Sequence, residues 1–159
     1  IDMGGPINKA SYVTGTALLT AAGTAGSDVM AAVMIGGMVP PLAIAISATI
    51  NKNIWPKAQR SGALVNYVMG LAFITEGAIP FAASNPLRVI PPLFLSSGVA
   101  GALSMTFGAV SKAPHGGIFA IVVGAVSNPI MYLLALVLGS VLGAILLIVS
   151  LNLGKKVEK

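Results

Sequence analysis

The feature that most constrains this chain is a long run without charge, because residues 116–154 contain no Asp, Glu, Lys or Arg. Over the whole chain only 8% of residues are charged and 56% are hydrophobic, whereas a soluble domain has about 25% charged residues. So few charges cannot cover a surface that faces water. The sequence therefore predicts an all-α, multi-pass membrane protein, since helices satisfy their own backbone hydrogen bonds in lipid.

Uncharged stretches mark the expected membrane crossings, each of which needs about 20 mostly apolar residues. The stretches are residues 10–27, 29–50, 89–111 and 130–151. Pro40 and Pro41 lie inside the second, where we expect a kink or break. Gly139 and Gly143 lie in the last and have the spacing that allows close helix packing.

One segment between these stretches cannot form a single regular helix. Its prolines are at positions 80, 86, 91 and 92. Each proline removes a backbone donor and disfavours helix at the preceding residue. We therefore expect residues 76–92 to form a broken helix or re-entrant hairpin that does not cross the bilayer. Glu76 should lie near the break and face a cavity, because irregular backbone at membrane depth must be buried in protein or line a cavity.

Basic residues predict the topology. One cluster lies in the loop at residues 51–60, and the other is formed by lysines 155, 156 and 159. Such clusters favour the cytoplasmic side of a membrane, and the net charge of +5 suits these loops better than a nucleic-acid surface. We expect both clusters on the cytoplasmic side, with two full crossings and re-entrant pieces between them.

Three ionisable side chains lie beside proline or glycine breaks: Glu76, Arg88 and His115. A charged group at the centre of a membrane helix costs roughly 2.5 kcal/mol or more on insertion scales, so these groups predict a wet cavity lined by protein. The carboxylate of Glu76 can accept hydrogen bonds from two adjacent sugar hydroxyls. The alternative is a structural pair between Glu76 and Arg88.

His115 is the single histidine, and it lies between Pro114 and two glycines where the backbone can turn and approach a ligand closely. It can bond a sugar hydroxyl or an incoming phosphoryl group; the alternative is a polar residue at a helix break. Asn8 follows a Gly-Gly-Pro turn that can open a helix toward the cavity, or simply start a helix at the membrane interface.

Several chemistries find no support in the sequence. The chain has no cysteine and one histidine, so we expect no metal site and no cofactor, and no residue can carry a phosphocysteine. The glycine-rich stretches do not match a phosphate-binding loop.

Together these segments resemble the fructose-specific enzyme IIC of the bacterial phosphotransferase system. The matching segments are residues 2–9 (DMGGPINK), 30–34 (MAAVM), 37–42 (GMVPPL), 73–82 (FITEGAIPFA), 88–91 (RVIP) and 113–119 (APHGGIF). They occur in the family's order and extend from residue 2 to residue 119.

The resemblance implies that residues 1–159 are the C-terminal, sugar-binding transport half of an enzyme IIC in the bacterial inner membrane. It implies re-entrant hairpins that move as an elevator against an N-terminal scaffold half. The expected partners are that half, the IIA and IIB domains and a second copy in a homodimer. Glu76 and His115 would bind fructose or a related hexose, joined by Asn8, with Asp2 and Arg88 in supporting roles. The chain would act as an enzyme only as the membrane component of this complex, where a phosphocysteine on IIB phosphorylates the sugar.

The family pattern leads us to expect an aspartate where this chain has Asn85, so a hydrogen bond would replace an ion pair with Arg88. The main alternative function is an ion-coupled secondary transporter with a broken-helix site, in which Glu76 would bind the proton or sodium ion. A purely structural membrane subunit would leave the three ionisable groups at helix breaks unexplained.

Overall fold

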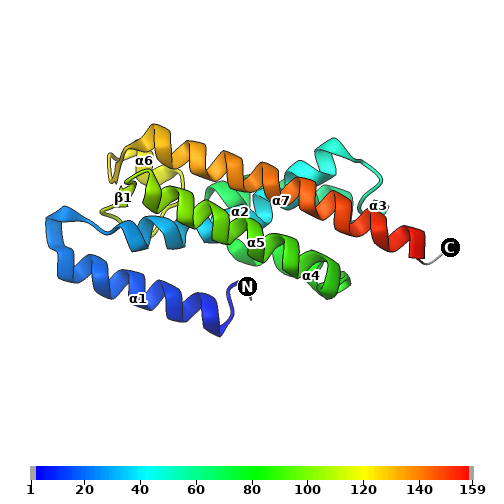
Figure 1. Cartoon of the computed structure of the whole chain (residues 1–159), viewed down its shortest axis with the longest axis horizontal. Coiled ribbons are helices and arrows are strands. Elements are labelled where there is room, and N and C mark those ends of the chain that lie inside the picture. The colour runs from blue at the N-terminus through cyan, green and yellow to red at the C-terminus, as the bar shows by residue number, and fades with distance from the viewer. Residues whose placement is uncertain (1–2, 158–159) are drawn as a thin grey trace.

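The structure is a computed structural model that describes residues 3–157, and it is 78% helical (Figure 1). Asp2, which was predicted to support the site, and the lysines of the C-terminal tail lie outside the part in which side chains are described. The elements in chain order are α1 (Pro6–Ala22), η1 (Gly23–Ala25), α2 (Asp28–Ile50), α3 (Lys57–Leu71), η2 (Thr75–Ala78), α4 (Ile79–Ser84), α5 (Pro86–Thr106), β1 (Val110–Ser111), α6 (Phe119–Val122), β2 (Val126–Ser127) and α7 (Pro129–Val157).

Helix α2 is the centre of the bundle and packs against α1, α3, α5 and α7. It begins at Ser27, whose Oγ accepts a hydrogen bond from the backbone N–H of Met30 at 3.1 Å. A serine at this position satisfies a donor that the first turn leaves free. The fully buried side chains of α2 include Met30, Met34 and Met38.

Three helices, α2, α5 and α7, are long and apolar enough to cross a membrane. The outward faces of α5 and α7 expose large apolar side chains such as Leu95, Val99, Val137 and Val141. This pattern agrees with the expected multi-pass helical protein. Residues 10–27 behave differently from the expectation, since α1 ends at Ala22 and is not among these three helices.

The glycine pair of α7 allows close helix packing, as expected. A side chain on Gly139 would collide with Ala100 of α5, and one on Gly143 would approach Ser96 Oγ at 2.7 Å and Ala43 Cβ at 2.8 Å. The prediction of close packing at these glycines is therefore confirmed.

Helix α2 continues through Pro40 and Pro41, so the break considered from the sequence is absent. Pro41 has no N–H to donate to the carbonyl of Gly37, four residues earlier. Thr75 replaces it, because its Oγ1 donates to the Gly37 carbonyl at 2.8 Å. A side chain from η2 thus satisfies an acceptor that the proline leaves open in α2.

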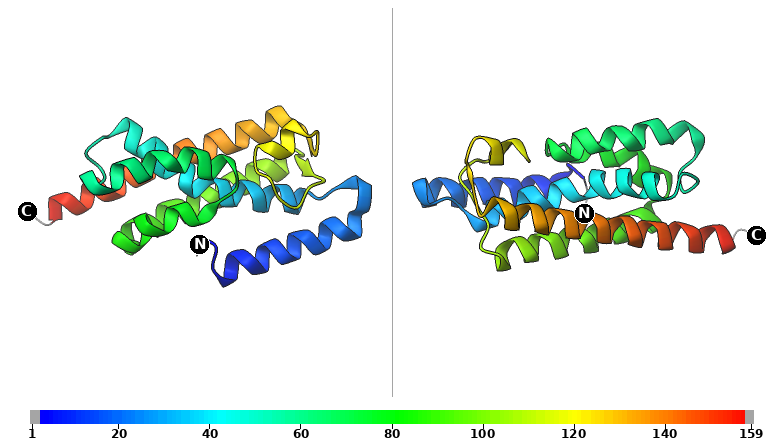
Figure 2. Two further views of the ribbon diagram at one scale, coloured as in Figure 1. Left: turned by 180° about the vertical axis from the view of Figure 1, so that it is seen from behind. Right: turned by 90° about the horizontal axis from the view of Figure 1, so that it is seen from above.

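Two irregular segments enter the bundle from opposite ends and meet beside α2 (Figure 2). The first is the hairpin formed by α3, η2 and α4. The second comprises residues 107–128, in which β1 and β2 pair as a short antiparallel ribbon that the sequence analysis missed. At their meeting point the N–H of Ile118 donates to the carbonyl of Leu71 at 2.8 Å.

The expected helix break in residues 76–92 is present, but its extent differs from the prediction. Asn85 separates α4 from α5 with an extended backbone (φ −155°, ψ 75°). Pro91 and Pro92, assigned from the sequence to the irregular segment, lie inside α5. Pro86 occupies the first turn of α5, where a proline loses no helical hydrogen bond. Whether this segment crosses the bilayer stays a prediction.

Candidate functional site

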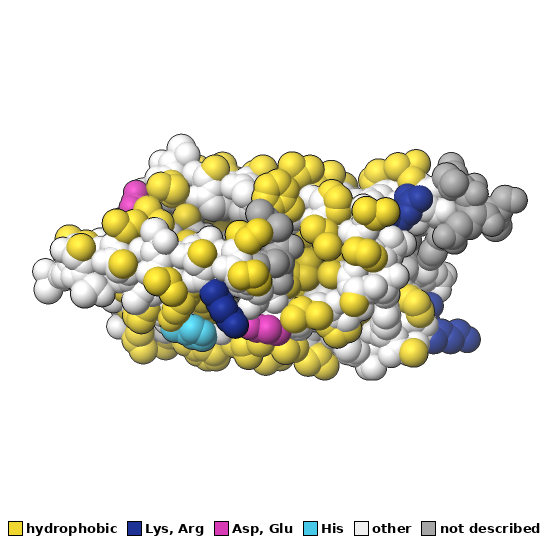
Figure 3. Space-filling view, turned by 90° about the horizontal axis from the view of Figure 1, so that it is seen from below, with side chains coloured by type: hydrophobic (Ala, Val, Ile, Leu, Met, Phe, Trp, Pro, Cys, Tyr) yellow, Lys and Arg dark blue, Asp and Glu magenta, His cyan; other side chains and the backbone are white. Residues whose placement is uncertain are grey.

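The side chains of Asn8, Glu76 and His115 line one pocket of about 290 Å³. This volume lies just below the range of roughly 300–1,000 Å³ that small-molecule sites have. The three residues come from α1, η2 and the loop between β1 and α6. The remaining lining residues are Gly4, Lys9, Tyr12, Phe73, Ile74 and Thr75. On this face of the molecule, histidine, basic and acidic side chains gather together (Figure 3).

Helix α1 supplies one wall of the pocket. Gly5 is its N-cap and Pro6 its first residue, so the Gly-Gly-Pro turn begins a helix. Asn8 of this helix lines the pocket, in agreement with the interpretation that the turn opens a helix toward a cavity. Asn8 and Tyr12 are four residues apart and therefore lie on the same face of α1. Both line the pocket, together with Lys9.

Glu76 lies in η2 close to the start of α1. A Cβ at Gly4 would stand 2.7 Å from Glu76 Oε1, and Gly4 has a φ of +101° that favours glycine. Gly4 therefore lets the carboxylate approach the N-terminal end of a helix, where the macrodipole stabilises negative charge. The Glu76 side chain remains exposed, so its carboxylate is accessible to a ligand.

Two aromatic rings lie beside the exposed side chain of His115. The ring centroid of His115 lies 5.2 Å from that of Phe73 and 6.4 Å from that of Tyr12. Phe73 has a φ of +63°, which is uncommon outside glycine and costs about 1–3 kcal/mol. Gly37 has no side chain in the space that the Phe73 ring occupies. The surrounding structure thus holds Phe73 in a strained conformation beside the histidine.

The two glycines after His115 fix its position. Gly116 and Gly117 have φ values of +119° and +55°. A side chain at Gly117 would collide with the carbonyl of Leu71 at the end of α3. Since only glycine fits this contact, the loop docks on α3 and brings the His115 ring to Phe73.

Arg88 lies away from this pocket, at the start of α5. Its Nη1 donates to the carbonyl of Ser150 at 3.2 Å, and Ser150 Oγ donates to the Arg88 carbonyl at 2.9 Å. Arg88 therefore joins α5 to α7. Within residues 3–157 the structure records no ion pair between Arg88 and Glu76, and the Arg88 guanidinium bonds Ser150 instead of Asn85.

Lys9, Tyr12, Phe73 and Thr75 line the pocket but were not singled out from the sequence. Lys9, Phe73 and Thr75 lie in the segments that carry the family resemblance, which is the one sequence signal that marks them. The contacts between α1, the C-terminal end of α3 and the loop that contains His115 cannot be predicted from the sequence, because they join segments that are distant along the chain. Within the described residues, no group of three or more His, Cys, Asp or Glu side chains can hold a metal ion.

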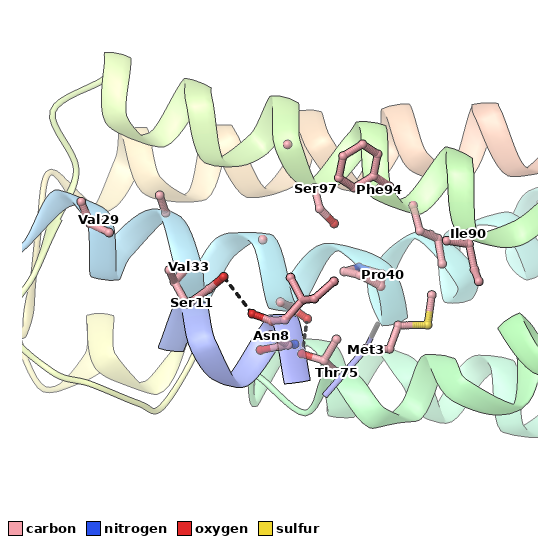
Figure 4. A pocket seen from close by; sticks show the side chains of 16 residues that line it. Met3, Asn8, Ser11, Val29, Val33, Pro40, Thr75, Ile90, Phe94 and Ser97 are labelled. Carbon is pink, nitrogen blue, oxygen red and sulfur yellow. Dashed lines mark hydrogen bonds between the residues drawn. The ribbon is translucent and has the colours of Figure 1, made fainter. Parts of the chain in front are cut away.

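A second pocket of about 310 Å³ adjoins the first and is mostly apolar (Figure 4). It lies between α1, α2 and α5, with Ile7, Val33, Leu93 and Phe94 among its lining residues. Asn8 and Thr75 line both pockets. The polar groups thus concentrate on the Glu76 side of these two residues.

Comparison with known proteins gives close relatives. The fructose-specific EIIABC component of a phosphotransferase system from Bacillus subtilis is 48% identical over 135 residues, which cover 85% of this chain and 20% of the relative. The fructose permease IIC component of Bacillus amyloliquefaciens is 47% identical over 135 residues, covering 85% of this chain and 42% of the relative. The fructose-specific EIIC component of Haloferax volcanii is 48% identical over 132 residues, covering 83% and 34%.

This chain spans less than half the length of each of these relatives. Two of them are named as IIC components alone, so the segment shared with this chain lies in that component. No model of a known protein family matches the chain, and no solved structure matches it.

Proposed function

Since this chain belongs to the family of IIC components of fructose-specific phosphotransferase systems, we propose that it forms the sugar-binding part of a membrane permease. Its substrate would be fructose or a related hexose, bound in the pocket of Asn8, Glu76 and His115. The observation that carries this proposal is the convergence of these three side chains from separate segments on one pocket.

The chemistry of the pocket suits a hexose. The Glu76 carboxylate accepts hydrogen bonds, the Asn8 amide both donates and accepts, and neutral His115 has one nitrogen of each kind. A sugar hydroxyl also both donates and accepts, so it can pair with each group. Tyr12 and Phe73 add apolar surface for the carbon skeleton of the sugar.

The proposed membrane arrangement follows from the helices. Helices α2, α5 and α7 would cross the bacterial inner membrane, while the α3–η2–α4 hairpin and residues 107–128 would be re-entrant. The pocket lies where these two segments meet, which agrees with the rule that irregular backbone at membrane depth lines a cavity. Movement of this unit against an N-terminal half, as an elevator within a homodimer, would carry the sugar across.

Phosphorylation would need partner domains. Relatives named EIIABC or EIIB'BC combine the IIC component with IIA or IIB components. The present chain contains no cysteine, so the phosphocysteine that phosphorylates the sugar would be on IIB. In this proposal the chain binds and presents the sugar, and IIB supplies the phosphoryl group.

The test is Glu76→Gln in the full-length protein, with Asp28→Asn as the matched control. Asp28 is an exposed acid at the start of α2, outside the pocket. Loss of a charge-assisted hydrogen bond is expected to lower fructose affinity by roughly ten- to a hundredfold and to reduce IIB-dependent phosphorylation. Asp28→Asn should behave as the wild type. Wild-type affinity and turnover in Glu76→Gln would reject the role of the carboxylate.

A second measurement separates this function from ion-coupled transport. Fructose uptake into membrane vesicles should require phosphorylated IIB and persist when proton and sodium gradients are dissipated. Uptake that follows an ion gradient and needs no phosphodonor would favour the secondary transporter instead.

A further inference from the structure

We propose that Lys9 forms a binding subsite for the phosphoryl group of a sugar phosphate within the same pocket. The inference rests on the proposed function, because a pocket in which a sugar is phosphorylated must also hold the product. A phosphoryl group has a charge of about −1.5 to −2 at pH 7 and three strong acceptor oxygens. The pocket therefore needs a positively charged donor that the uncharged sugar itself does not require.

Lys9 has the required position. It lines the pocket together with Glu76 and His115, and Figure 3 shows histidine, basic and acidic side chains next to one another on this face. It is the one Lys or Arg among the described residues that line the pocket. A phosphoryl group near His115 would thus meet the Lys9 ammonium.

Helix stability does not explain a lysine at this position. Lys9 is the fourth residue of α1, and its backbone N–H donates to the carbonyl of Gly5 at 3.0 Å. The positive end of the helix macrodipole lies at this end of α1 and disfavours a cation. A charge that opposes the local field is better explained by a ligand than by the helix.

The Lys9 side chain is also available to a ligand. It is exposed, and in the described part of the chain it forms no ion pair or side-chain hydrogen bond, although Glu76 lines the same pocket. Before phosphorylation its charge would offset that of Glu76. Afterwards it would offset the phosphoryl group, whose repulsion from Glu76 would otherwise oppose product binding.

The experiment measures dissociation constants of fructose, fructose 1-phosphate and fructose 6-phosphate for the full-length protein in detergent. The variants are Lys9→Met, Lys9→Arg and the control Lys57→Met, which removes an exposed charge at the start of α3 outside the pocket. Lys9→Met should weaken binding of at least one fructose phosphate by roughly ten- to a hundredfold. Its fructose affinity should fall far less than its affinity for that phosphate, and Lys9→Arg should retain most phosphate binding.

Three results would overturn the role of Lys9. Equal weakening of fructose and its phosphates would show that Lys9 only balances Glu76. Unchanged binding of both fructose phosphates, or their failure to bind a wild-type protein that binds fructose, would show that no phosphoryl subsite exists. A wild-type protein that binds none of the three compounds would instead reject the proposed sugar-binding function. Addition of salt to the wild type should weaken binding of the phosphate more than that of fructose.

Discussion

At the scale of single residues, glycines decide whether the site can assemble. Gly117 lets the His115 loop contact the end of α3, and Gly4 leaves room for the Glu76 carboxylate. Both positions have a positive φ, and at both a side chain would collide with the neighbouring group. These glycines therefore position the two ionisable side chains, Glu76 and His115, that are predicted to bind the sugar.

Gly117→Ala should displace the His115 loop, because its new Cβ meets the Leu71 carbonyl and strains a φ of +55°. We expect a loss of about 1–3 kcal/mol in stability and weaker fructose binding. The control is Gly98→Ala in α5, where a Cβ has no neighbour within 4 Å and alanine favours the helix by roughly 0.5–1 kcal/mol. Thermal unfolding and fructose titration in detergent measure both effects. Equal behaviour of the two variants would contradict the role of Gly117.

The sequence predicts the polar residues of the site better than their surroundings. Glu76 and His115 can be picked out from the sequence because an ionisable side chain in a membrane segment is energetically costly. Such a side chain therefore indicates a functional role. The aromatic residues Tyr12 and Phe73 carry no such signal, because an apolar membrane chain contains aromatic side chains for many reasons. Their places beside His115 depend on contacts between segments distant in sequence.

At the scale of elements, the bond from Thr75 to α2 links helix continuity to the site. Thr75 is 38 residues away from Gly37 in the sequence, which explains why the sequence analysis considered a break at Pro40 and Pro41. A donor from another element satisfies the carbonyl that Pro41 leaves free. The same bond holds η2, and therefore Glu76, against α2.

Thr75→Val should leave the Gly37 carbonyl without its donor and cost about 1–3 kcal/mol of stability. Thr75→Ser keeps the hydroxyl and should lose less. In a Pro41→Ala background the new N–H can serve Gly37, so Thr75→Val should cost less there than in the wild type. Unfolding of the four proteins in a double-mutant cycle gives this coupling. Additive effects would show that Thr75 acts through something other than this carbonyl.

At the scale of the whole molecule, the two ends of the bundle are marked by the Ser27–Ser111 bridge and by the loop that contains Lys52. Ser27 bonds Ser111 at one end, with N–H to carbonyl distances of 2.8 and 3.0 Å in the two directions. Helix α2 runs from there to the loop that contains Lys52 at the other end. The two segments enter from these two ends (Figure 2). The pocket lies where they meet, and Glu76 and His115 are exposed there.

Labelling of introduced cysteines tests the topology, since the chain has none of its own. In a cysteine-free full-length protein, Lys57→Cys and Lys156→Cys should react with an impermeant reagent from the cytoplasmic side. Thr24→Cys in η1, at the opposite end of α2, should react from the outside. Labelling of positions 57 and 156 from opposite sides would contradict two full crossings between the basic clusters.

The central claim is that one pocket formed by Asn8, Glu76 and His115 binds the sugar. The most direct measurement is an experimental structure of the full-length protein with fructose bound. The account predicts the sugar in the pocket of about 290 Å³, with its hydroxyls in hydrogen-bond contact with Glu76 and His115. Fructose bound in the apolar pocket between α1, α2 and α5, or elsewhere in the protein with neither side chain in contact, would contradict it.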